Sequence, residues 1–278
     1  MSESPEIGEF IDAGGVNTNY HDLGEAGGKS PITFIHGSGP GVTSFANWRL
    51  VFPEVAQHYR VLGPDMVGFG FTDRPADGRY SLDRWVKHFL DFLDALGIEK
   101  THLVGNSFGG GLSVALAIRA PERFDRIVLM GAAATRFELT DGLDFAWGYT
   151  PSLENMRKML DLFAYDRSLV TDELAKLRYE ASLRPGVQEA YASMFPAPRQ
   201  NGVNALASNE QDIRNILHEV MIVHGREDKI IPLSASIQLA ELLPNAQLHV
   251  FGKCGHWTQI EHNRRFVELI LNFFNEAN

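Results

Sequence analysis

The sequence predicts an α/β fold, in which a mostly parallel central sheet is flanked by helices and is interrupted by a helical insertion. Three observations predict it. Short apolar runs alternate with amphipathic runs along most of the 278 residues, which is typical of a parallel sheet covered on both faces. The alternation stops near residue 136 and resumes near residue 209. Several apolar runs end in glycine-rich loops, and loops at the carboxyl ends of parallel strands are where such folds build their sites.

Residues 1–135 are expected to form the first part of the α/β core. The residues from Met1 to about Phe10 are polar, and we expect them to be frayed. Apolar or alternating runs predict strands at Val16–His21, which alternates in the manner of an edge strand, and at Ile32–Ile35, Arg60–Leu62, Thr101–Val104 and Ile127–Met130. Helices are predicted at Asn47–His58, Leu82–Leu96 and Gly111–Ala120.

Residues 136–208 contain no convincing buried strand, and we expect them to form a helical cap. Helical patterns occur at Leu153–Phe163, Asp172–Leu183 and Val187–Met194, separated by prolines. The core pattern returns in residues 209–278, with strands at Met221–Val223 and Leu248–Phe251 and helices at Leu233–Leu243 and Arg264–Asn275. The segments 1–135 and 209–278 are therefore predicted to form one α/β core that carries the cap.

The composition excludes several classes of partner. The formal net charge of −10 argues against nucleic acid. No apolar run approaches the roughly 20 residues that a bilayer-spanning helix needs, and the N-terminus lacks the pattern of a signal peptide, so no membrane partner is expected. The single cysteine, Cys254, rules out an intrachain disulfide and fits the reducing cytoplasm.

The stretch from Val104 to Gly110 reads Gly-x-Ser-x-Gly between a predicted strand and a predicted helix. This is the context of a nucleophile elbow. Gly105 and Gly109 remove side chains that would collide in the sharp turn, so Ser107 is the candidate nucleophile. The amide of Phe108 is then free to face a developing oxyanion. A glycine-rich turn with an incidental serine is the alternative, because this short motif often arises by chance.

A serine nucleophile needs a base to take its proton and an acid to orient that base. In this kind of fold the chain order is serine, acid, histidine. Asp228 and His256 each follow a predicted strand downstream of the elbow, so Asp228 is predicted to be the orienting acid and His256 the general base. Glu227 is the rival acid, while Asp65 precedes Ser107, against the expected order.

The glycine-rich loop from His36 to Gly41 follows a buried-type strand. A phosphate-binding P-loop is excluded because Gly-Lys-Ser/Thr is absent. We expect this loop to form the second half of an oxyanion hole, with backbone amides near Ser38 facing Ser107. The sequence has neither His-Glu-x-x-His nor a cysteine pair, so no metal site is predicted.

The motifs taken together resemble one family along essentially the whole chain. The stretches His36–Gly41, Asn47–Trp48, Gly105–Gly110, His224–Asp228 and Cys254–Trp257 resemble those of the α/β-hydrolase superfamily and, within it, of the meta-cleavage product hydrolases. These are carbon–carbon bond hydrolases of bacterial aromatic degradation. The cap segments Phe163–Val170 and Met194–Gln200 are most similar to the subgroup that acts on products of phenol, toluene and alkylbenzene catabolism.

This resemblance implies Ser-His-Asp catalysis without a cofactor. The implied substrate is a 2-hydroxy-6-oxohexa-2,4-dienoate with hydrogen or a small alkyl group at C6, and water cleaves its C5–C6 bond. The resemblance also implies a homo-oligomer, with a dimer as the expectation. It assigns substrate binding to Gly37, Gly39, Asn47, Asn106, Arg178 and Trp257.

Among these residues, Arg178 matches the carboxylate-binding arginine of the family, and a bidentate grip suits that role. Phe108, Leu143, Trp147 and Phe163 are candidate contacts for the C6 substituent. Three other functions stay open, one of them a cofactor-free haloperoxidase or perhydrolase. A carboxylesterase or lactonase would use the same triad, and a non-catalytic ligand receptor could use the same fold.

Overall fold

The structure is a computed structural model, which describes residues 4–25 and 27–276. Within these residues, eight strands form one sheet in the order β1-β2-β4-β3-β5-β6-β7-β8. The strands are β1 (Glu9–Asp12), β2 (Asn17–Leu23), β3 (Ile32–Ile35), β4 (Val61–Pro64), β5 (Thr101–Asn106), β6 (Phe124–Met130), β7 (Val220–Gly225) and β8 (Ala246–Phe251). From β4 to β8 along the sheet all neighbours pair in parallel, and the antiparallel pairs are β1 with β2 and β2 with β4.

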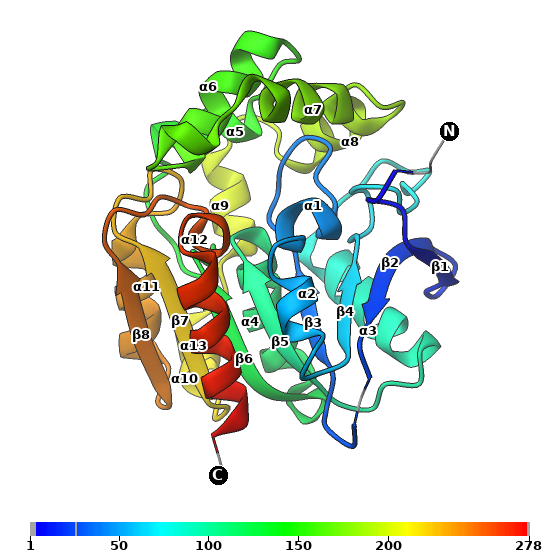
Figure 1. The fold of residues 1–278 in the computed structure, drawn as a ribbon, viewed down its shortest axis with the longest axis vertical. Coiled ribbons are helices and arrows are strands. Elements are labelled where there is room, and N and C mark those ends of the chain that lie inside the picture. The colour runs from blue at the N-terminus through cyan, green and yellow to red at the C-terminus, as the bar shows by residue number, and fades with distance from the viewer. Residues whose placement is uncertain (1–3, 26, 277–278) are drawn as a thin grey trace.

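Helices cover both faces of this sheet, as the alternating pattern predicts (Figure 1). One face packs against α1 (Ser44–Trp48), α2 (Phe52–Val55) and α13 (Asn263–Asn275), through a cluster that includes Phe34, Trp48 and Phe266. The other face packs against α3 (Leu82–Ala95), α4 (Phe108–Arg119) and α11 (Leu233–Leu242). The short helices α10 (Glu210–Arg214) and α12 (Thr258–Glu261) and a 3₁₀ turn at Pro121–Arg123 complete the core.

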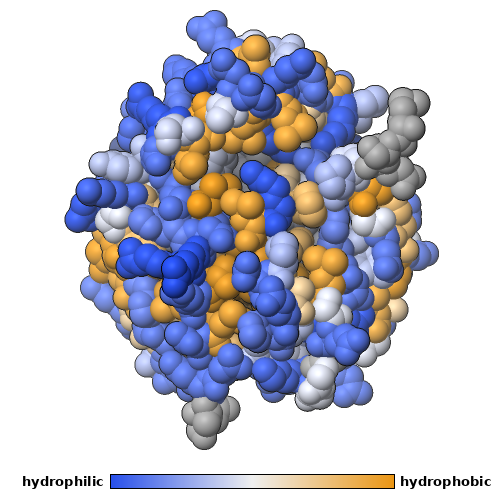
Figure 2. Space-filling model, viewed as in Figure 1, coloured by the Kyte–Doolittle hydropathy of each residue, from blue (hydrophilic) through white to orange (hydrophobic). Residues whose placement is uncertain are grey.

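Five α-helices follow β6 before α10 is reached, and no strand of the described residues lies between β6 and β7. They are α5 (Asp141–Trp147), α6 (Leu153–Phe163), α7 (Asp172–Ser182), α8 (Val187–Met194) and α9 (Gln200–Leu206), with a 3₁₀ turn at Arg167–Leu169. Figure 1 shows α5 to α8 above the carboxyl ends of the parallel strands. Figure 2 shows apolar residues gathered on this face where these helices meet the core.

Three local predictions differ from the structure. The predicted helix Asn47–His58 is two short helices, α1 and α2, because Pro53 stands in the first turn of α2 and starts a new helix. The predicted edge strand Val16–His21 corresponds to β2, which is covered by β1 on its outer side. The N-terminal segment is not frayed over its described part, since Glu6 is buried and residues 9–12 form β1, while residues 1–3 lie outside the described residues.

Candidate active site

Ser107 lies at the sharp turn between β5 and α4. Its backbone has φ 55° and ψ −112°, a conformation that costs free energy for a residue with a side chain. The flanking glycines make the turn feasible. A Cβ on Gly105 would lie 2.3 Å from the carbonyl oxygen of Gly109, and a Cβ on Gly109 would lie 2.4 Å from that of Ile35. The structure therefore has the backbone of a nucleophile elbow at this serine.

Asp228 and His256 come together although they follow different strands, β7 and β8. The Nδ1 of His256 lies 2.7 Å from Oδ2 of Asp228 and donates a hydrogen bond to it. The other carboxylate oxygen accepts the amide hydrogens of Ile230 and Ile231, at 2.7 and 3.1 Å. Two backbone donors thus hold the carboxylate in place, and the carboxylate orients the imidazole through its Nδ1.

Electrostatics favour the charged form of Asp228. Burial is the largest single influence and raises the pKa of this carboxyl, but it is outweighed. The charge and hydrogen bond of His256, the charge of His224 and the amide of Ile230 together lower the pKa below its ordinary value. Asp228 therefore remains a carboxylate at neutral pH, as an acid that orients a histidine must.

The two rival acids are engaged elsewhere. Glu227 accepts hydrogen bonds from Arg226 and from the amide of Cys254. Asp65 is completely buried and accepts the amides of Ser44 and Phe71, while burial raises its pKa to about 7. Neither carboxylate contacts His256, so the geometry favours Asp228.

The triad candidates converge at the carboxyl end of the sheet. The amide of Ser107 donates to the carbonyl of Met130 in β6, and a Cβ on Gly131 would lie 3.2 Å from the imidazole of His256. Glycine at this position keeps the space beside the histidine open. No hydrogen bond joins the Ser107 hydroxyl to His256 within the described ranges 4–25 and 27–276; such contacts are often long in ligand-free sites.

The loop after β3 is held by His36, which is fully buried. Its Nε2 accepts the amide hydrogen of Met66, so Nδ1 carries the proton and donates to the carbonyl of Gly37 at 2.8 Å. Burial lowers the pKa of His36 to about 4, which keeps the ring neutral. The amide of Gly37 donates to Oδ1 of Asn47 at 3.1 Å. Both peptide groups of Gly37 are therefore fixed just before Ser38.

The two predicted oxyanion donors are available for a ligand. The amide of Ser38 has no acceptor among the residues that the structure describes. Phe108 is the first residue of α4, and the first amides of a helix have no intrahelical acceptor. The Ser38 hydroxyl accepts a hydrogen bond from the indole of Trp147 at 3.0 Å, which ties α5 to the loop.

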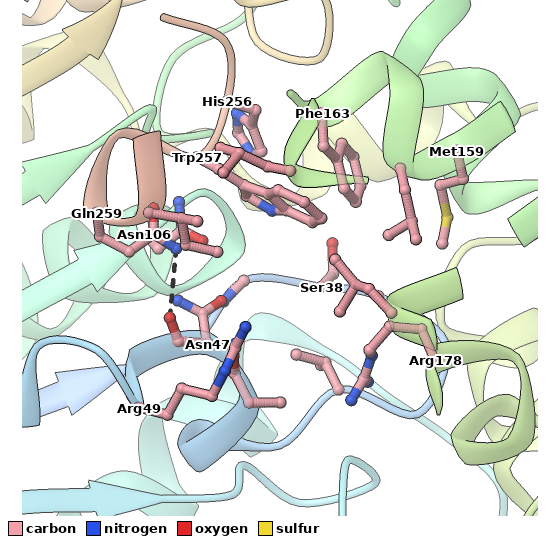
Figure 3. A pocket seen from close by; sticks show the side chains of 18 of the residues that line it. Ser38, Asn47, Arg49, Asn106, Met159, Phe163, Arg178, His256, Trp257 and Gln259 are labelled. Atoms are coloured by element: carbon pink, nitrogen blue, oxygen red, sulfur yellow. Dashed lines mark hydrogen bonds between the residues drawn. The ribbon is translucent and has the colours of Figure 1, made fainter. Parts of the chain in front are cut away.

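A cavity of about 240 Å³ lies against this centre, between the core loops and helices α6 and α7. Of the predicted site residues, those that line it are Gly37, Ser38, Gly39, Asn47, Asn106, Arg178, His256 and Trp257. Figure 3 shows Arg49 and Arg178 on one side of the cavity and Trp257, Phe163 and Met159 on the other. One wall is thus polar and cationic, and the facing wall is apolar.

Of the four residues suggested for the C6 substituent, only Phe163 lines this cavity. The ring of Phe108 packs instead against His36 and Trp85 in the core. The rings of Trp147 and Phe195 stack, with centroids 4.3 Å apart.

Sequence reasoning missed two polar residues of the cavity, Gln259 and Arg49. Gln259 is 1% exposed, and its Nε2 donates to the carbonyl of Asn47 at 3.4 Å. Its Oε1 and the Nδ2 of Asn47 are buried without a hydrogen-bond partner in the described part of the chain. Buried polar atoms of this kind are uncommon, and here they are groups that a polar ligand would satisfy. Gln259 follows Trp257 by two residues and Arg49 follows Asn47 by two, which was the only signal in the sequence.

Arg178 reaches the cavity from α7 but already has two partners. Its Nη1 contacts Oε1 of Glu6 at 3.1 Å, and its Nη2 donates to the carbonyl of Gly41 at 2.6 Å. Burial lowers the pKa of Arg178, and the charge of Glu6 counteracts that effect. A guanidinium has five N–H donors, so three remain for a ligand.

Neither a membrane helix nor a metal site can be identified in the described residues. No helix there has both the length and the apolar character that a bilayer-spanning helix requires. No group of three His, Cys, Asp or Glu side chains there is placed to hold a metal ion. The buried thiol of Cys254 contacts Thr258, and burial raises its pKa to about 12, so it is a poor nucleophile.

Comparisons with known proteins agree with this geometry. Residues 30–263 match the family described as alpha/beta hydrolase fold. The chain is 61% identical over 268 residues to 2-hydroxy-6-oxo-2,4-heptadienoate hydrolase of Pseudomonas putida, covering 96% of each protein. It is 59% identical over 274 residues to 2-hydroxymuconate semialdehyde hydrolase of a Pseudomonas species, covering 99% of this chain and 96% of the relative.

A solved structure gives the same result. A mutant meta-cleavage product hydrolase (CumD) from Pseudomonas fluorescens, complexed with acetates, is 62% identical to this chain with a TM-score of 0.97. The match covers 99% of this chain and 100% of the other. The chain therefore belongs to the α/β-hydrolase superfamily and, within it, to the meta-cleavage product hydrolases.

Proposed function

We propose that this protein hydrolyses the C5–C6 bond of 2-hydroxy-6-oxohexa-2,4-dienoates that carry hydrogen or a small alkyl group at C6. The products are 2-hydroxypenta-2,4-dienoate and a carboxylic acid. The observation that carries the proposal is the paired Asp228 and His256 at a cavity with one cationic and one apolar wall. A dienoate needs such a site, since its carboxylate requires donors and its conjugated chain requires apolar contact.

The reaction begins with ketonisation, in which the 2-hydroxyl loses its proton and C5 gains one. The Ser107 hydroxyl then attacks the C6 carbonyl while His256 takes its proton and Asp228 orients the imidazole. The amides of Ser38 and Phe108 stabilise the oxyanion that forms at C6. When the C5–C6 bond breaks, the electron pair passes into the conjugated enone and is protonated to the hydroxydienoate.

The second half of the reaction releases the C6 fragment. Ser107 is left as an acyl ester, and His256 activates a water molecule that attacks the ester carbonyl. The same two amides stabilise the second oxyanion, and the serine regains its proton from His256. The imidazole of His256 thus serves as base and then as acid in each half.

The size and charge of the cavity support a small anionic substrate. Its volume of about 240 Å³ lies below the roughly 300–1,000 Å³ of pockets for drug-sized ligands. Arg178 and the unpartnered Nδ2 of Asn47 supply donors for a carboxylate. The relatives named for heptadienoate and muconate semialdehyde substrates, at 61% and 59% identity, favour methyl or hydrogen at C6.

The test is a spectrophotometric assay with 2-hydroxymuconic semialdehyde and its 6-methyl and 6-phenyl analogues, in which loss of the yellow dienolate is followed. Fast bleaching of the first two, with the phenyl compound slower, is expected. Ser107→Ala should reduce turnover by roughly 10³ or more. Ser113→Ala is the matched control, because its hydroxyl bonds the carbonyl of Gly109 within α4 and lies outside the cavity lining. Brisk turnover of p-nitrophenyl acetate without bleaching would instead identify an esterase.

The proposal includes a cytoplasmic location and a homodimer. The single cysteine supports the first, and the second is what the family resemblance implies. Light scattering on the purified protein measures the mass of the assembly directly, and a monomer at assay concentration would contradict the proposed dimer.

A further inference from the structure

A cluster of three arginines and one buried carboxylate borders the cationic side of the cavity, and two of the arginines, Arg49 and Arg178, line it. Glu6, 7% exposed, contacts Arg178 at 3.1 Å through one oxygen and Arg184 at 2.5 Å through the other. Arg49 is the third arginine, close enough for its charge to affect Arg178. Three guanidinium groups and one carboxylate leave this side of the cavity with two positive charges in excess.

Arg49 differs from the other two in having no carboxylate partner. Within residues 4–25 and 27–276, no ion pair includes it, and its only side-chain hydrogen bond is from Nη1 to the carbonyl of Ala46 at 2.6 Å. It is partly buried and lines the cavity, whereas Arg184 does not. Arginine does not lose its proton in proteins, so this charge persists, and Glu6 acts on it from a distance rather than through an ion pair.

The position of Arg49 on α1 places it with a second unused donor. Arg49 caps the C-terminus of α1, with its amide donating to the carbonyl of Phe45 at 2.8 Å. Asn47, two residues earlier, has a buried Nδ2 without a partner and also lines the cavity. One short helix thus presents two groups to the same space, a guanidinium that has no ion pair among the described residues and an amide N–H group. This pair suits an anion with two oxygens.

We propose that Arg49 is a substrate-binding residue that, with Asn47, holds the carboxylate end of the dienoate in addition to Arg178. This inference rests on the proposed function, since it concerns the anionic end of that substrate. Arg178 has given two of its N–H groups to Glu6 and Gly41, and its charge is shared with a buried carboxylate. Arg49 supplies a further positive charge, on which Glu6 acts through space without an ion pair among the described residues.

The experiment compares four proteins, wild type, Arg49→Gln, Arg49→Lys and Arg184→Gln, on two substrates. The anionic substrate is 2-hydroxymuconic semialdehyde, and the neutral one is p-nitrophenyl acetate. Arg184→Gln is the matched control, because it removes the same charge from the same cluster outside the cavity lining. Wild-type turnover of the anionic substrate, measured first, tests the proposed function separately.

Arg49→Gln is expected to raise KM for the anionic substrate roughly tenfold or more, with kcat/KM for the neutral ester within about twofold of wild type. Arg49→Lys should recover part of the loss, because it keeps the charge but not the two-pronged geometry. Arg184→Gln should leave both substrates within about twofold.

Three results would overturn the proposal. An unchanged KM for the anionic substrate in Arg49→Gln would show that Arg49 does not hold it. Equal losses on both substrates would show a structural role. An equal rise of KM in Arg184→Gln would show that the general field of the cluster, and not contact at Arg49, attracts the anion.

Discussion

Replacing Asp228 by asparagine separates the orienting role of the carboxylate from its role in the fold. Oδ1 of Asp228 accepts the amides of Ile230 and Ile231, so asparagine must keep its carbonyl oxygen at that position. Its NH₂ group then replaces the oxygen that lies 2.7 Å from Nδ1 of His256. A donor facing Nδ1 requires a lone pair there, so the ring proton moves to Nε2.

The magnitude follows from that change of tautomer. With a proton on Nε2, His256 cannot accept the proton of Ser107, and the imidazolium also loses its neighbouring negative charge. In the Ser-His-Asp template this substitution reduces kcat by about 10⁴, which corresponds to about 5 kcal/mol in the activation barrier. We expect Asp228→Asn to show a loss of this size and to retain the fold, because both backbone donors keep an acceptor.

The assay measures kcat by the bleaching of 2-hydroxymuconic semialdehyde, and circular dichroism measures folding. Glu227→Gln is the matched control, since Glu227 carries the same charge one residue earlier and bonds Arg226 and the amide of Cys254. Its kcat should stay near that of wild type. The assignment would be refuted by an Asp228→Asn enzyme with kcat within tenfold of wild type, or by a large loss of kcat that occurs only in Glu227→Gln.

Two further predictions concern the cap contact and the pH dependence of stability. Arg178→Ala should raise KM for dienoates roughly tenfold or more, because the contact with the substrate carboxylate is lost. It should also lower Tm, because Glu6 loses a buried partner and the carbonyl of Gly41 loses a donor. Unchanged kinetics would show that another residue holds the carboxylate. His102→Gln should flatten the rise of unfolding free energy with pH. Burial holds the pKa of His102 at about 4, against about 6.5 when unfolded, so the folded state loses up to about 3 kcal/mol as pH falls from 6.5 to 4. Urea titrations at several pH values measure the slope, and an identical slope in the variant would contradict the assignment.

The parts of the molecule that the sequence predicted are those governed by local rules. The helix Leu153–Phe163 begins and ends where its apolar spacing indicated, since Ser152 caps its first turn. The elbow was predictable because Gly105 and Gly109 fit a turn in which any Cβ would collide with backbone. The choice of Asp228 over Asp65 required only chain order, and the hydrogen bond to His256 agrees with Asp228.

The features that were missed depend on contacts between distant segments. Nothing in the polar N-terminal sequence indicates that Glu6 is buried, because its partners stand about 170 residues later in the cap. The sequence also does not indicate that Arg49 lacks an ion pair among the described residues, since a sequence pattern cannot show which arginines contact a carboxylate. Gln259 has a buried unsatisfied oxygen only because α12 packs beside α1. Periodicity predicts which face of an element is buried but not which polar atoms meet there.

The same long-range contacts connect Arg178 to the loop after β3. The carbonyl of Gly41 accepts its hydrogen bond, and a Cβ on Gly41 would lie 2.5 Å from the carbonyl oxygen of Ala181 in the same cap helix, so loop and helix touch directly. Gly41 belongs to the loop that carries the Ser38 amide. In the proposed mechanism, a carboxylate bound at Arg178 contacts a guanidinium that is also hydrogen-bonded to the loop of the oxyanion hole. In that mechanism, recognition of the substrate carboxylate and stabilisation of the oxyanion both involve the segment 37–41.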